Sequence, residues 1–172
     1  MLLALFLLFF GHLNPLAPAG SKASVLLFIR SDCPISNRYA PLIEQMYDRY
    51  SPQKIEFHLI YVEPGLTASK MEEHRKEYGY AIPAILDEKL NYVKLAGART
   101  TPEAAVFVNS NLVYLGRIDD RYASVSQSRP APTRHDLEDV LQEIVDGKSL
   151  SFHQTTAVGC AIEGLPETQP TQ

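Results

Sequence analysis

The sequence contains little cysteine. Of its 172 residues only Cys33 and Cys160 are cysteines, and no Cys-x-x-Cys motif joins them. Their spacing excludes a zinc finger. Positive charge is not in excess either, because 16 lysines and arginines stand against 20 acidic residues and the formal net charge is −4. That balance gives no reason to expect nucleic acid or an anionic membrane as a partner. The 45% hydrophobic content is that of an ordinary globular domain, long enough to bury a core.

The first ten residues, MLLALFLLFF, form an apolar run much shorter than the roughly 20 residues that span a bilayer. Ala17, Pro18 and Ala19 then give a small-x-small pattern typical of signal cleavage before Gly20. No lysine or arginine precedes the run, so an uncleaved anchor is the alternative. We expect residues 1–19 to be a signal peptide or short anchor and the protein to be exported, to the periplasm or another extracytoplasmic compartment. A membrane is an expected partner only if this segment is retained.

Between residues 20 and 148 the apolar pattern alternates between the periods of strands and helices. It predicts strands at 23–29, 55–62, 81–86, 100–108 and 112–118, and helices at 41–50, 69–78 with Thr67 as its cap, 91–96 and 135–145. This order predicts an α/β domain over residues 20–148. The expected architecture is a mixed central sheet with helices on both faces and a C-terminal antiparallel hairpin followed by a helix. Residues 149–172 are expected to form a polar C-terminal tail that carries Cys160.

Cys33 stands at the corner between the first strand and the following helical pattern, in the stretch FIRSDCPIS. Unpaired N–H groups and the positive end of the helix dipole favour the thiolate there. Pro34 suits the first helical turn because its missing N–H would be unpaired anyway. Ser36 can donate a hydrogen bond to the sulfur. Cys33 is therefore the candidate nucleophile.

Three stretches carry a resemblance to a known superfamily: VLLFIRSDCPIS, AIPAILDEKLNYVKLAGARTTPEAAVFV and NSNLVYLGRID. Over roughly residues 23–147 the chain resembles thioredoxin-like proteins, above all the redoxin branch. That branch includes alkyl-hydroperoxide-reductase-like proteins and exported thiol–disulfide oxidoreductases. Two positions depart from the pattern. Ser36 stands where dithiol enzymes carry a second cysteine, and Arg30 stands where peroxiredoxins carry threonine or serine.

The resemblance implies that Thr101-Pro102 is the cis-proline position, which in relatives lies against the active cysteine. There the residue before the proline offers backbone hydrogen bonds to a docked thiol substrate. Pro34, Thr101 and Pro102 are thus the expected substrate-binding residues. The alternative is a trans proline that begins a strand.

Four charged residues are candidates for tuning the pKa of Cys33. Arg30 and Arg38 would favour its thiolate. The run Arg117-Ile-Asp119-Asp120-Arg121-Tyr122 follows the expected hairpin, and in this fold it can approach the cysteine corner. We therefore consider that Asp119 or Asp120 pairs with Arg30 or Arg38, or acts as a distant base. The alternative is a solvated charged loop.

A lone thiol that attacks a disulfide forms a mixed disulfide, and a second thiol must then release it. Cys160 is the candidate for that resolving thiol, and an external small thiol is the alternative. A static Cys33–Cys160 bridge that pins the tail is a third possibility. The two cysteines with a histidine, His135 or His153, could instead hold Cu(I).

The sequence as a whole predicts a thiol–disulfide oxidoreductase of antioxidant type. It acts through Cys33 on protein or small-molecule thiols and disulfides, with no cofactor and no metal. The alternatives are an atypical peroxiredoxin-like peroxidase and a non-catalytic Cu(I)-binding or adaptor module.

Overall fold

The computed structural model describes residues 20–165, so the expected signal segment lies outside the described residues. Its elements are β1 (Ala23–Ile29), α1 (Pro34–Tyr50), a 3-10 turn (Ser51–Gln53), β2 (Ile55–Tyr61), α2 (Ala68–Glu77), β3 (Ala84–Leu86), α3 (Asn91–Ala96), β4 (Thr100–Thr101), β5 (Glu103–Val108), β6 (Asn111–Gly116), β7 (Tyr122–Ser124), β8 (Gln127–Ser128), α4 (Asp136–Val145), β9 (His153–Gln154) and β10 (Cys160–Ala161). None of the helices in the described part is long and apolar enough to cross a membrane.

The predicted mixed central sheet is confirmed. Its strand order is β3-β2-β1-β5-β6-β9, with β1 at the centre between a parallel and an antiparallel neighbour. All seven residues of β1 are buried, as expected for a strand covered on both faces. Strand β3 lies at one edge of the sheet, because it pairs only with β2.

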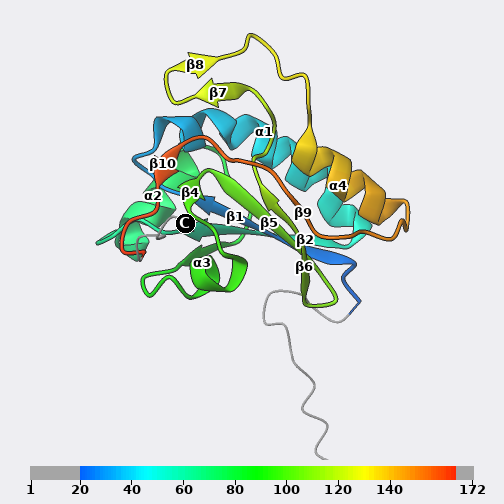
Figure 1. Cartoon of the computed structure of the whole chain (residues 1–172). Helices are drawn as coiled ribbons and strands as arrows, with labels where there is room; N and C mark the ends of the chain where they lie inside the picture. The colour runs from blue at the N-terminus through cyan, green and yellow to red at the C-terminus, as the bar shows by residue number, and fades with distance from the viewer. Residues whose placement is uncertain (1–19, 166–172) are drawn as a thin grey trace, which may run out of the picture.

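Helices cover both faces of the sheet, with α1 and α4 on one side and α3 on the other (Figure 1). Side chains of β1 alternate between the two cores. Val25 and Leu27 pack in the core that contains residues of α1 and α4, whereas Leu26 and Phe28 pack in the core that contains residues of α3. This arrangement leaves the carboxyl end of β1 free to lead into the Cys33 corner.

The helix after Cys33 begins earlier than the apolar pattern predicts. It starts at Pro34 rather than near Pro41, and Pro41 lies inside it. The first turns bury Ile35, Ser36 and Tyr39, and this mixture of apolar and polar residues interrupts the apolar pattern. The predicted helix start at residue 41 was therefore wrong, and Pro34 occupies the first turn.

The residues after α4 pack against the domain. β9 pairs in parallel with β6, and β10 pairs antiparallel with β4, so the tail runs back across the molecule (Figure 1, orange to red). A Cβ on Gly116 would lie 2.1 Å from Thr155 Oγ1, so the glycine permits the close approach of the tail to β6. The returning tail carries Cys160 to the opposite end of the sheet from α4.

Candidate redox site

Cys33 is the N-cap residue of α1, and no part of it is exposed to solvent. The buried strand β1 fixes the start of the corner, and Pro34 occupies the first helical turn as predicted. The Cys33 carbonyl accepts the first helical hydrogen bond, from the N–H of Asn37 at 3.0 Å. The sulfur lies 3.3 Å from the carbonyl oxygen of Thr101, so the β4 segment lies directly against it.

Cys160 is brought to this corner by β10. Its backbone pairs with Thr101, whose hydroxyl donates to the Cys160 carbonyl at 3.3 Å. The Thr101–Pro102 peptide bond is cis. Both cysteines are free thiols, and their sulfur atoms are 2.6 Å apart. A disulfide has an S–S distance of about 2.05 Å, so a small shift suffices to join the pair.

The two thiols differ in acidity. Burial acts to raise the pKa of Cys33, but hydrogen bonds from the Cys160 thiol and from the backbone and hydroxyl of Ser36 outweigh it, and the pKa is lowered. Burial, together with the hydrogen bond it gives to Cys33, raises the pKa of Cys160 to about 11. The Ser36 hydroxyl is buried and has no nitrogen or oxygen partner among the described residues, which leaves it available to the sulfur. Of the two thiols, Cys33 is therefore the one that loses its proton more readily.

Gly159 allows the tail to lie this close. A Cβ at this position would lie 1.9 Å from the Thr101 carbonyl oxygen, a distance that no side chain can accept. Beyond the cysteine, the N–H of Ile162 donates to the Arg99 carbonyl at 2.9 Å, and the Ile162 side chain is buried. The tail thus lies against residues 99–101 as an added strand.

Arg30 joins the corner to the tail. Its guanidinium donates to the Asp32 carboxylate at 2.8 and 2.9 Å, to the Ala161 carbonyl at 3.3 Å and to Glu163 at 2.8 Å. These carboxylates raise the pKa of the arginine, which stays charged. The partners of Arg30 are therefore the neighbouring loop and the tail, not Asp119 or Asp120. Arg38 is exposed on α1.

Asp119 and Asp120 instead organise their own loop. Asp119 is buried and accepts hydrogen bonds from the Tyr39 hydroxyl and, at 2.9 Å, from the N–H of Arg121. Asp120 accepts from the N–H and the hydroxyl of Thr133, both at 2.6 Å, and these bonds lower its pKa. The solvated-loop alternative does not describe these buried aspartates, which brace the segment between β6 and α4.

A buried network that the sequence did not identify supports the Cys33 corner from behind. His74 of α2 bonds the Tyr61 hydroxyl through Nδ1 at 2.7 Å and the Asn37 side-chain oxygen through Nε2 at 3.0 Å. The Asn37 amide donates in turn to the Ser31 carbonyl at 2.9 Å. This orientation of Asn37 assigns the proton to Nε2, and burial lowers the pKa of His74, so the ring is neutral. No sequence motif links positions 37 and 74, which only the fold brings together.

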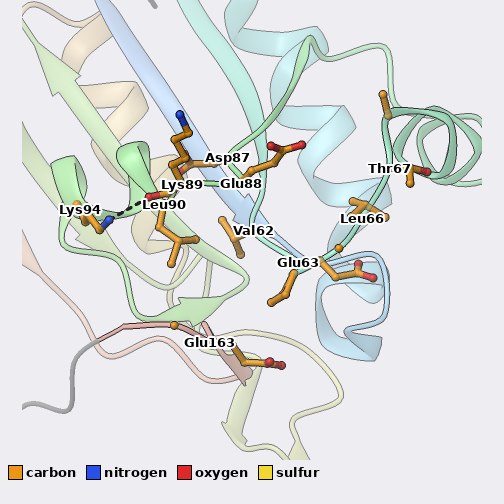
Figure 2. Close-up of a pocket in the computed structure, with 14 residues that line it drawn as sticks. Val62, Glu63, Leu66, Thr67, Asp87, Glu88, Lys89, Leu90, Lys94 and Glu163 are labelled. Atoms are coloured by element: carbon orange, nitrogen blue, oxygen red, sulfur yellow. Dashed lines mark hydrogen bonds between the residues drawn. The ribbon is translucent and has the colours of Figure 1, made fainter.

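An open pocket of about 880 Å³ adjoins the corner. Figure 2 shows Glu63 after β2 and Glu163 of the tail on its wall, with Lys89, Leu90 and Lys94 across it. Glu63 accepts a hydrogen bond from the N–H of Ser31, two residues before Cys33, and Glu163 pairs with Arg30. The wall of the pocket is therefore bonded to both halves of the cysteine site.

Neither histidine considered for copper lies at the cysteines. His135 precedes α4 and faces Glu138. His153, in β9, stacks on the ring of Tyr114 in β6. Among residues 20–165, no group of three His, Cys, Asp or Glu side chains has a metal-binding arrangement.

Solved structures of other proteins share this fold, although no family model and no curated protein matches the sequence. An uncharacterised conserved protein from Geobacillus kaustophilus is 22% identical, with a TM-score of 0.74 over 86% of this chain and 80% of that one. A hypothetical protein from Sinorhizobium meliloti 1021 is 25% identical, with a TM-score of 0.71 over 83% and 80%. A candidate thiol:disulfide interchange protein DsbE from Chlorobium tepidum is 15% identical, with a TM-score of 0.57 over 73% and 81%. The chain has a thioredoxin-like fold, as the sequence resemblance implied.

Proposed function

We propose that this protein is a thiol–disulfide oxidoreductase whose redox pair is Cys33 and Cys160. The 2.6 Å approach of the two sulfurs is the observation that carries the proposal. The resolving thiol that Ser36 cannot supply comes from the tail, 127 residues further along the chain. The pair performs the work of a Cys-x-x-Cys motif with cysteines far apart in sequence.

The contacts around the pair support exchange rather than a purely structural bridge. A structural disulfide needs no stabilised thiolate, whereas here hydrogen bonds from Ser36 and Cys160 lower the pKa of Cys33. A lowered pKa marks a cysteine that reacts or leaves readily. Arg30 also couples the corner to the tail through hydrogen bonds at the surface, which can break when the pair changes state.

The substrates are thiols and disulfides, and the backbone at Thr101 and Pro102 is the site where a disulfide substrate docks once the tail has left it. In the described structure β10 already pairs with Thr101, so the chain's own tail takes the place of a substrate strand. The adjoining pocket, with Glu63 and Glu163 on its wall, can receive the part of a small substrate that does not react. Export, proposed from the leader-like residues 1–19, would place the protein where disulfides persist.

Transfer of a disulfide to a reduced reporter protein tests this function. The chain is oxidised with oxidised glutathione, and mass spectrometry checks for the Cys33–Cys160 disulfide. The oxidised protein is then mixed with reduced, unfolded ribonuclease. We expect disulfide transfer by the unaltered chain and none by Cys33→Ser or Cys160→Ser, with Ser36→Ala retaining part of the rate. A disulfide that forms but is not passed on, even over hours, would identify a static bridge and overturn the proposal.

A further inference from the structure

The two cysteine residues of the pair differ in their access to solvent. Cys33 is 0% exposed, enclosed by the start of α1, by Thr101 and by the tail, whereas Cys160 is partly exposed on the edge strand β10. A thiolate attacks a disulfide at one of its two sulfurs, and access decides which one. With the tail in place, an external thiol can approach Cys160 but not Cys33.

From this geometry, and relying on the redox pair proposed above, we propose that external thiols exchange with the protein at Cys160, with Cys33 as the leaving group. This inverts the usual expectation for a cysteine at a helix start, which is that it is itself the point of attack.

The exchange balances in two steps. An external thiolate attacks the Cys160 sulfur of the disulfide, a new S–S bond forms there, and the bond to Cys33 breaks, so Cys33 leaves as a thiolate with the electron pair. A second external thiolate then attacks the external sulfur of that mixed disulfide and releases Cys160, which takes up a proton. Two external thiols are oxidised to one disulfide, and the Cys33–Cys160 disulfide is reduced.

The acidities of the two groups suit these roles. A sulfur whose thiolate is more stable leaves faster, and the pKa of Cys33 is lowered by Ser36 and Cys160. Cys160, whose pKa is raised to about 11, retains its proton once released and is a poor competitor for a disulfide. Transfer of the disulfide to a dithiol substrate is the same reaction with both external thiols on one molecule, and it passes through the same mixed disulfide on Cys160.

The burial of Cys33 also limits the reactions of the reduced protein with disulfides. Its nucleophile is the Cys33 thiolate, which lies beneath Gly159, Cys160 and the Thr101 carbonyl. A disulfide substrate reaches it only when the tail leaves β4. Direct attack by Cys33 on an external disulfide therefore requires the open state, whereas exchange in the closed state passes through Cys160 in both directions.

Rapid quenching locates the point of attack. The full chain is oxidised to the Cys33–Cys160 disulfide, mixed with reduced glutathione for a few seconds, quenched in acid, and alkylated and digested for mass spectrometry. We expect the glutathione adduct on Cys160 in about tenfold excess or more over Cys33. Adduct on Cys33 in equal or greater amount overturns the proposal. If no Cys33–Cys160 disulfide forms in the first stage, the underlying redox function fails instead, and the inference with it.

The same experiment in urea is the matched control. Unfolding exposes both sulfurs equally, so the adduct should divide nearly evenly between the two cysteines. A preference for Cys160 that survives in urea would come from the local sequence and not from burial, and would also overturn the inference.

Discussion

The two halves of the cysteine pair are held in different ways. The corner around Cys33 is anchored from inside, by the buried strand β1 and by the chain of hydrogen bonds from His74 through Asn37 to Ser31. The segment around Cys160 is held from outside, by a two-residue strand pair with β4 and by surface contacts of Arg30. Segments with few buried contacts open most readily. One cysteine is therefore fixed in the fold, and the other lies on a part of the chain that can move.

The largest expected effect comes from the tail. Gly159→Val places side-chain atoms against the Thr101 carbonyl, where a Cβ alone would lie at 1.9 Å. Overpacking of this kind costs about 1–3 kcal/mol, which corresponds to roughly a 5–150-fold increase in the open population. We expect iodoacetamide to alkylate Cys33 of the reduced protein faster by a factor in that range. Ala161→Val, on the exposed neighbouring position, should change the rate less than twofold. An unchanged rate in Gly159→Val would show that the tail does not shield Cys33.

A mutation in the network behind Cys33 should change the stability of the protein rather than the exposure of Cys33. Asn37→Ala removes the partner of His74 Nε2 and of the Ser31 carbonyl. A buried polar group left without a partner costs about 1–3 kcal/mol, and urea unfolding should show a loss of this size. The control is Arg38→Ala, on the adjacent exposed position, which should stay within about 0.5 kcal/mol. Equal stabilities of the two variants would mean that the network does not anchor the corner.

The pKa of Cys33 depends on both halves of the site, because Cys160 donates one of the hydrogen bonds that lower it. We expect the alkylation rate of Cys33 to inflect below the free-thiol value of about 8.5. In Cys160→Ala this donor is lost, so the inflection should move to higher pH, and Cys160→Ser should restore part of the shift. Mass spectrometry of the alkylated peptide measures each profile. Identical inflections in all three proteins would leave Ser36 as the sole cause.

A smaller effect is expected from the surface contacts of the tail. Arg30→Gln removes the ion pair with Glu163, and exposed pairs contribute about 0.2–1 kcal/mol. Cys33 should be alkylated up to about fivefold faster at low salt, and the difference should shrink in high salt because screening weakens the pair. The control is Arg49→Gln, whose ion pair with Glu138 lies far from the cysteines in the fold and should leave the rate unchanged. A larger effect would make Arg30 the main anchor of the tail.

The loop that carries Asp119 and Asp120 should not affect the acidity of Cys33. Asp119→Asn weakens the bond from Tyr39 and lowers the free energy of unfolding, while the pH inflection of Cys33 stays where it is. The alkylation profile decides the point. A displaced inflection in Asp119→Asn would restore the role of distant base considered from the sequence.

Much of the framework was predictable because its signals are local. The bounds of β1 and α3 agree with the apolar pattern, and Thr67 caps α2 as predicted. The helix of Cys33 was predicted too short, because buried Ser36 and Tyr39 interrupt the apolar pattern of its first turns. The predicted site residues Cys33, Pro34, Ser36 and Thr101 lie together at the corner. Of the charged residues proposed to tune Cys33, Arg30 lies at the corner, whereas Asp119 and Asp120 bond within their own loop.

The remaining features of the site depend on contacts between distant positions. Gly159 carries no signal by itself, and its role is evident only once the Thr101 carbonyl lies against it. The same holds for His74 and Asn37, which belong to different helices. A short run of residues determines its own turn or cap, but it does not determine which distant segment packs against it.

The sequence by itself determined the alternation of strands and helices, the position of Cys33 at the corner after the first strand and the lack of a second cysteine nearby, because periodicity and local motifs act over a few residues. The tertiary structure alone decided that Cys160 meets Cys33, which thiol is covered and which is accessible, and which acids face Arg30. The physical reason is that burial and electrostatic pairing depend on distances through space. Those distances are set by the return of the tail along β6 and β4, after the local elements have formed.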